Sequence, residues 1–314
     1  MLDSNLAMPS QNFKSRYPPQ PVGEPIVVSP AFLLKSFAAV IIAALICVYL
    51  TLCLLFYQGQ WQLIFHPSRT VDRTPASAGL HYEDIHFDAT ETAHLQLTGW
   101  FIPADPGAKY ASTTILLCHD NIGSLSNTID SAAQLHVLGI NVFTYDPRGF
   151  GKSDWAAPRE TRWYEDADAA YRYLTDTRHI PPQSIVAYGI GLGASAAAHI
   201  ATSNPVAALI AINPVPAGRA LVASDIRTRI LPMRFLFHEH FLWPNDLKIP
   251  TLFIEDKSIT CPRPPADFIP AVCLTVNQVH NLFTQSTAPK MYSESPTTNT
   301  EFLTRFLDEY LPAN

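Results

Sequence analysis

The chain has 314 residues, of which 15% are charged and 47% hydrophobic, and its formal net charge is −6. This acidic balance provides no cationic face for nucleic acid, and the apolar content excludes a disordered chain. Five cysteines in a chain of this length do not make a disulfide scaffold. The length allows one large domain or two smaller ones, each with its own core.

An uncharged apolar run occupies residues 36–57. Because a helix rises about 1.5 Å per residue, the run is long enough to cross the roughly 30 Å hydrocarbon core of a bilayer. The h-region of a cleavable signal peptide, the alternative, is shorter at about 7–15 residues. The sequence therefore predicts a disordered proline-rich tail over 1–30, a single membrane span over 31–58 and one domain over 59–314.

The orientation of this span follows from the basic residues around it. Three precede the run and two follow it closely, namely Lys14, Arg16 and Lys35, then Arg69 and Arg73. Because cytoplasmic flanks carry the excess of Lys and Arg, the pattern favours a main domain outside the cytoplasm.

Strand and helix patterns alternate after the run. Residues 81–87 and 95–102 alternate apolar and polar side chains, which indicates an antiparallel edge pair. Residues 213–248 are irregular and rich in aromatics, and we interpret them as a cap-like segment. Further strands are predicted at 113–118, 141–145, 184–188, 206–212, 251–254 and 272–276, and helices at 128–138, 162–175, 192–203 and 299–311. Such β–α repeats predict an α/β fold with a mostly parallel sheet and helices on both faces.

Functional sites in such sheets form at the carboxyl ends of the strands. Four strand ends carry distinctive residues. They read CHDNIG at 118–123, YDPRGFGKS at 145–153, YGIGLGA at 188–194 and QVHN at 278–281. Candidate catalytic and binding residues are therefore expected in these four segments.

In this order the segments resemble the α/β-hydrolase superfamily. More narrowly, they are similar to membrane-anchored serine hydrolases, in which the anchor is followed by a segment like LIFHPSR at 63–69. That family has H-G-N-x-G at its oxyanion loop, D-Y-R-G-x-G-x-S after the next strand, G-x-S-x-G at its nucleophile elbow, then an aspartate and a late histidine. The resemblance covers roughly residues 61–311 and implies an α/β-hydrolase fold.

The sequence departs from the family pattern where the chemistry should be. Gly191 stands at the position of the nucleophilic serine, so no acyl-enzyme can form there. At the acid position the resemblance aligns Ser258, and Asp256 is the candidate for a displaced acid. His280 alone clearly matches the catalytic triad. Asp120 replaces a glycine of the oxyanion loop.

Asp120 bears directly on the oxyanion hole. The resemblance assigns the hole to the N–H groups of Asn121 and Leu192, with His119 orienting the loop by hydrogen bonding. A carboxylate about 4 Å from a developing oxyanion would cost about 4 kcal/mol at an effective dielectric near 20. A carboxylate turned away would leave the hole intact, and both arrangements stay open at this stage.

These departures favour a membrane-anchored pseudoenzyme that binds a small acyl or lipid ligand, or a protein partner, instead of turning a substrate over. The alternative is an active hydrolase of ester, thioester or amide bonds, with Ser195, Ser258 or Ser126 as a displaced nucleophile near His280. A third hypothesis is a membrane-tethered interaction protein without a ligand. If only the nucleophile were missing, Gly191→Ser would create esterase activity, and we expect almost none because Asp120 and the acid loop also differ.

No cofactor, metal or nucleic acid is predicted. Residues 189–194 also match the dinucleotide fingerprint G-x-G-x-x-A, but residues 209–213 lack the expected acidic residue. The N-terminus of the helix that follows could still hold an anion. His238, Glu239 and His240 lack a third ligand at recognisable spacing and are expected in a solvated cap. Cys261 and Cys273 are candidates for a disulfide if the domain is extracytoplasmic.

Overall fold

The computed structural model describes residues 28–90, 94–223, 225–244, 247–255, 271–275 and 299–311. By its internal contacts the chain divides into two compact units, residues 1–52 and 53–314. Almost all of the predicted tail at 1–30 lies outside the described residues. The second unit contains the sheet and every site discussed below.

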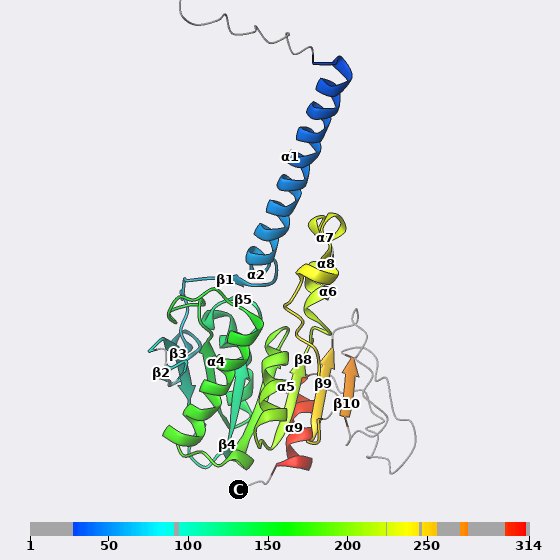
Figure 1. Cartoon of the computed structure of the whole chain (residues 1–314). Helices are drawn as coiled ribbons and strands as arrows, with labels where there is room; N and C mark the ends of the chain where they lie inside the picture. The colour runs from blue at the N-terminus through cyan, green and yellow to red at the C-terminus, as the bar shows by residue number, and fades with distance from the viewer. Residues whose placement is uncertain are drawn as a thin grey trace, which may run out of the picture. The chain divides into compact units, whose positions relative to one another are not determined.

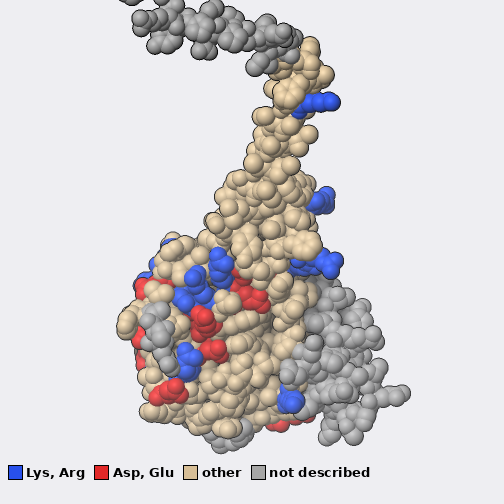
Figure 2. Space-filling view, in the orientation of Figure 1, with Lys and Arg blue, Asp and Glu red and all other residues tan. Residues whose placement is uncertain are grey.

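The apolar run lies within one long helix, α1 (Pro30–Gly59), in which Lys35 is the single charged residue. Among the described residues, α1 is the one helix long and apolar enough to cross a membrane. A signal sequence near an N-terminus can also meet these criteria of length and apolarity. Figure 2 shows the almost uncharged surface of this helix and, on the visible face of the domain, basic and acidic side chains intermixed.

The central sheet has eight strands in the order β10-β9-β8-β7-β4-β6-β3-β2. β3 is antiparallel to both of its neighbours, whereas the other neighbouring pairs are parallel. The strands are β2 (Glu83–Asp88), β3 (Gln96–Ile102), β4 (Tyr110–Cys118), β6 (Ile140–Asp146), β7 (Ile185–Ile190), β8 (Ala208–Ile212), β9 (Thr251–Glu255) and β10 (Ala271–Thr275). The predicted antiparallel edge pair and parallel interior are confirmed.

Helices cover both faces of the sheet (Figure 1). Alternate residues of β4 show the division, because Leu116 packs in one core cluster and Leu117 in the other. The first cluster includes α4 (Glu160–Arg172) and α5 (Gly193–Ser203), and the second includes α3 (Ile129–Val137) and α9 (Asn299–Tyr310). The period-two alternation of a strand therefore serves two helical layers at once.

Short elements complete the second unit. α2 (Trp61–Ile64) follows α1, and β1 (His66–Pro67) pairs in parallel with β5 (Ile122–Gly123). The predicted cap-like segment contains α6 (Gly218–Val222), α7 (Arg227–Ile230) and α8 (Met233–Leu236). The predicted helix at 162–175 is α4, continued by a π-helical turn (Tyr173–Thr177).

Candidate active site

The loops at the carboxyl ends of β4, β6 and β7 meet at one edge of the sheet. The β4 loop carries residues 119–121, β6 ends at Asp146, and β7 leads through Gly191 into α5. Since β4 lies between β6 and β7, their three loops are neighbours. Three of the four segments singled out in the sequence are therefore together, while the fourth, with His280, lies outside the described residues.

Gly191 forms the turn between β7 and α5 in the left-handed conformation, with φ +57°. Its N–H donates to Ile212 O at 2.9 Å, which ties the turn to β8. The flanking glycines are required by close packing, because a Cβ at Gly189 would overlap the backbone of Ala194 and one at Gly193 the carbonyl of Cys118. The sharp strand-to-helix turn is therefore present without any side chain at its tip.

The carboxylate of Asp120 points into this turn. Its Oδ1 accepts the N–H of Asn121 at 2.8 Å and the N–H of Leu192 at 2.8 Å. These are the two groups that the resemblance assigns to the oxyanion hole, and both donate to the protein's own carboxylate. The open question of which way Asp120 turns is thus answered by its position at the start of α5, where the helix dipole favours an anion.

Gly191 and Asp120 fit each other sterically. A Cβ placed on Gly191 would overlap all three atoms of the Asp120 carboxyl group. A side chain at position 191 and an inward carboxylate at position 120 therefore exclude each other unless the loop moves. The two departures from the family pattern form one coupled arrangement.

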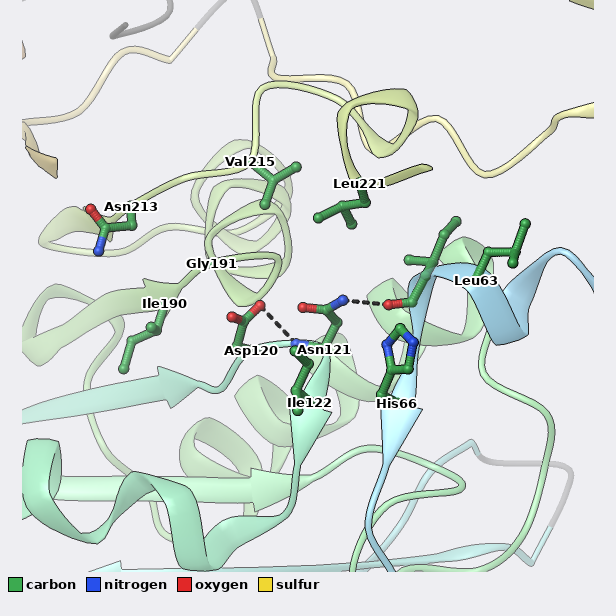
Figure 3. Close-up of a pocket in the computed structure, with 11 residues that line it drawn as sticks. Leu63, His66, Asp120, Asn121, Ile122, Ile190, Gly191, Asn213, Val215 and Leu221 are labelled. Atoms are coloured by element: carbon green, nitrogen blue, oxygen red, sulfur yellow. Dashed lines mark hydrogen bonds between the residues drawn. The ribbon is translucent and has the colours of Figure 1, made fainter. Parts of the chain in front are cut away.

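A pocket of about 370 Å³ opens beside this pair (Figure 3). Its lining includes one carboxylate, Asp120, and no Lys or Arg. The remaining lining is Leu63, Ile64, His66, Asn121, Ile122, Ile190, Gly191, Asn213, Val215 and Leu221. The side-chain amide of Asn121 donates to the carbonyl of Ile64, so α2 is attached directly to the oxyanion loop.

Sequence reasoning missed the pocket wall formed by α2 and β1. The segment at 63–69 resembles the family, yet its sequence alone indicates no role for Leu63, Ile64 or His66. Its register with β5, His66 opposite Ile122, brings this wall to the oxyanion loop. A pairing of two-residue strands leaves no periodic signal in the sequence.

His119 and Asp146 support the loop from below. His119 Nδ1 lies 2.6 Å from the carbonyl of Asp120, consistent with the orienting role expected of this histidine. Its Nε2 lies 3.4 Å from Asp146 Oδ1, which also accepts the N–H of Leu125 at 2.9 Å. Both side chains are buried, so they hold the loop and do not face the pocket.

The loop after β6 is held by a buried ion pair. Arg148 donates through Nε to Asp166 Oδ1 at 2.6 Å and through its backbone N–H to Oδ2 at 2.7 Å. Burial raises the pKa of the Asp166 carboxyl to about 7, and the charge of Arg148 opposes that shift. Through these contacts Arg148 fixes the geometry of the loop.

The expectation of a solvated His238–Glu239–His240 segment is wrong for Glu239, whereas His240 is exposed and His238 half-buried. Glu239 is buried, and its Oε2 accepts the N–H of Glu160 at the start of α4 at 2.6 Å. Glu160 accepts the N–H of His240 at 2.6 Å and of Phe241 at 2.7 Å. Burial raises the pKa of Glu239. Two carboxylates thus fasten the cap to α4, and no cluster of metal-ligating side chains occurs among the described residues.

Two of the proposed displaced nucleophiles are already engaged. Ser195 is buried and donates to Leu192 O at 2.7 Å, and Ser126 is buried and donates to Arg73 O at 3.0 Å. Ser258, Asp256 and His280 lie outside the described residues. Leu192, the N-cap of α5, contributes its backbone N–H and has a fully buried side chain.

Fold and site together define the class of protein: an open, mostly parallel sheet with a strand-to-helix elbow and an oxyanion loop is an α/β-hydrolase architecture. A family model described as "Serine aminopeptidase, S33" matches residues 110–291, which is more than half of the chain. The chain belongs to this family.

Relatives cover parts of the chain. The uncharacterized protein Rv2307c of Mycobacterium tuberculosis is 28% identical over 209 residues, 66% of this chain and 72% of that protein. The alpha/beta hydrolase domain-containing protein WAV2 of Arabidopsis thaliana is 31% identical over 162 residues, 49% of this chain and 51% of that protein. The chain thus spans about half the length of the Arabidopsis relative.

A solved structure agrees with the fold. The esterase Pf2001 of Pyrococcus furiosus superposes with a TM-score of 0.54 at 18% identity, covering 79% of this chain and 100% of that one. At this identity the similarity concerns the fold alone.

Proposed function

We propose that this protein is a membrane-tethered α/β-hydrolase domain that binds a small ligand with an apolar body and does not hydrolyse acyl groups. One observation carries the proposal: Asp120 Oδ1 accepts both N–H groups of the oxyanion hole, directly above a Gly191 that has no side chain. The pocket of about 370 Å³ beside this pair is the candidate binding site.

Acyl transfer fails on two counts in such a site. In serine proteases, losing the nucleophile costs about 10⁶ in turnover, and losing one oxyanion-hole donor costs about 10²–10³. Here neither donor is available to a substrate oxygen while Asp120 is in place. The carboxylate also repels the developing negative charge that the hole normally stabilises.

The membrane tether is supported by α1 and by the outer surface of the cap. Tyr57 ends the apolar run and Trp61 follows it, where interfacial aromatics are typical. In the cap, Ile230 is 66% exposed and Phe235 80% exposed, close in sequence to Arg229 and Arg234. Exposed apolar side chains interspersed with arginines suit a lipid surface.

Activity-based labelling tests the absence of acyl chemistry. The full chain in detergent is treated with a fluorophosphonate probe, and intact mass is measured. We expect no stoichiometric adduct. An adduct on one defined residue would overturn the proposal, and Ser195→Ala and Ser126→Ala variants would show whether either serine carries it.

Extraction tests the tether separately. Membranes containing the full chain are washed with alkaline carbonate, and we expect the protein to remain in the pellet. Release into the supernatant at the level of a peripheral control protein would contradict a spanning anchor.

A further inference from the structure

The pocket beside Gly191 presents a hydrogen-bond acceptor where a hydrolase site presents two hydrogen-bond donors. In an oxyanion hole the N–H groups face a ligand oxygen, whereas here they face Asp120 Oδ1. Asp120 is half-buried and lines the pocket. What the site offers a ligand at this point is therefore a carboxylate, which is an acceptor, in place of two donors.

The second carboxylate oxygen completes this reversal. Within the described part of the chain, no hydrogen bond to Asp120 Oδ2 is formed, and both carboxylate oxygens lie over the tip of the elbow where a side chain at 191 would stand. In Figure 3 the carboxyl group lies between Ile190 and Asn121, with one oxygen bonded to the Asn121 N–H. A ligand that reaches Gly191 meets this group first.

Besides Asp120, the lining has three polar side chains, those of His66, Asn121 and Asn213, and an apolar part that comes from three parts of the fold. α2 contributes Leu63 and Ile64, the cap contributes Val215 and Leu221, and the end of β7 contributes Ile190. A volume of about 370 Å³ is large enough for a short alkyl chain with a polar head. One charged group at the end of an apolar pocket fixes the orientation of such a ligand.

We propose that this pocket binds a primary amine, with its ammonium group on the Asp120 carboxylate and its alkyl body against Leu63, Ile64 and Leu221. The inference rests on the proposed function, because it assigns a ligand class to that same non-hydrolytic site. An ammonium group supplies both the positive charge and the hydrogen-bond donors that the carboxylate lacks. Carboxylates and acyl carbonyls, which bring only acceptors, are excluded from this end of the pocket.

A matched set of probes tests the ligand class. The full chain in nanodiscs of zwitterionic lipid is titrated with n-hexylammonium, 1-hexanol and hexanoate, which share one alkyl length, and binding is followed by ligand-observed NMR. We expect hexylammonium to bind about tenfold or more tightly than hexanol, because a charge-assisted hydrogen bond is added. Hexanoate should bind more weakly than hexanol. Equal affinities, or a preference for hexanoate, would overturn the proposal without any variant.

The Asp120→Asn variant assigns the effect to the carboxylate. An asparagine Oδ1 can accept the same two N–H groups, while its amide presents a donor in place of Oδ2. Hexylammonium affinity should fall by about tenfold, and hexanoate affinity should rise. Asp105→Asn is the matched control: it makes the same change on an exposed loop outside the pocket and should leave both affinities unchanged. If hexylammonium bound Asp120→Asn as tightly as the unmodified chain, the site would be wrong.

The two proposals fail in different ways. A stoichiometric fluorophosphonate adduct would overturn the proposal of a non-hydrolytic site, whatever the amine titration shows. An unlabelled protein with no preference for hexylammonium would remove only the amine assignment.

Discussion

Two loops at adjacent strand ends use aspartate in opposite ways. After β6, Asp146 is fully buried and supports the backbone, while the adjacent Arg148 pairs with the buried Asp166. After β4, Asp120 is half-buried and faces an open pocket. The first loop keeps the D-x-R-G pattern of the family it resembles, and the second departs from that pattern.

The difference separates holding the fold from doing the chemistry. The β6 loop depends on buried polar contacts whose loss is costly, so the fold needs them whether or not the chain catalyses a reaction. In a serine hydrolase the N–H groups of the oxyanion hole bind a substrate oxygen, whereas here the two N–H groups at the β4 loop donate to Asp120 of the same chain. A carboxylate over a glycine is one stable solution, because it satisfies two N–H groups and fills space.

The largest expected effect comes from removing the buried ion pair that holds the loop after β6. Asp166→Ala should lower the free energy of unfolding by about 3–5 kcal/mol, because the buried Arg148 loses its buried partner and keeps only the exposed carboxylate of Glu165. Denaturant unfolding of the full chain at pH 8 measures this, since the Asp166 carboxyl, with its pKa raised to about 7, is ionised there.

Glu165→Ala is the matched control for that variant. Glu165 Oε2 also accepts from Arg148, at 2.6 Å, but its side chain is 51% exposed against 1% for Asp166. An exposed pair contributes about 0–1 kcal/mol, so this variant should be nearly neutral. Similar losses in both variants would contradict the structural role given to the buried pair.

A second, intermediate effect concerns the elbow. Gly191→Ala should lower the free energy of unfolding by about 1–3 kcal/mol, because its Cβ overlaps the Asp120 carboxyl and its φ is left-handed. In an Asp120→Gly background the overlap is gone, and only about 1 kcal/mol of backbone strain should remain. The coupling between the two sites is read from a double-mutant cycle of denaturant unfolding. Identical costs in both backgrounds would show that the two residues are independent.

The serine version of this cycle has a chemical readout. Gly191→Ser alone should gain almost no esterase activity, since its side chain and the Asp120 carboxylate compete for the same space. The Asp120→Gly, Gly191→Ser double variant should react with fluorophosphonate more than either single variant. A single Gly191→Ser that hydrolyses esters as well as the double variant would contradict the blocking role of Asp120.

The smallest expected effect concerns the thiol of Cys118, which should not react with an alkylating reagent in the folded chain. Cys118 is buried at the end of β4, and burial raises the pKa of its thiol to about 12. At pH 8 the Cys118 thiol therefore stays protonated, and only the thiolate reacts with iodoacetamide. We expect Cys118 to remain unmodified in the folded chain. Peptide mass mapping before and after denaturation measures this, and rapid labelling of the folded chain would show that the β4 end opens.

Much of the fold follows from local patterns in the sequence. The apolar run predicts α1, and short β-branched runs such as 113–118 predict buried strands because both faces of a parallel strand are covered. The cap was harder to predict. Glu239 lies in a polar triplet whose sequence indicates a solvated segment. Its burial depends on a hydrogen bond from the N-terminus of α4, which lies 79 residues earlier in the chain.

Two facts can be read directly from the sequence: position 191 has no hydroxyl, and position 120 has a carboxylate. The role of that carboxylate depends on the fold, because Asp120 and Leu192 are 72 residues apart and meet where β4 and β7 end side by side. The same applies to the α2 wall of the pocket, which reaches the oxyanion loop through a hydrogen bond from the Asn121 side-chain amide to the Ile64 carbonyl, 57 residues earlier in the chain. Side-chain identity is local information, but the direction of a side chain depends on the partners that the fold brings within hydrogen-bond distance.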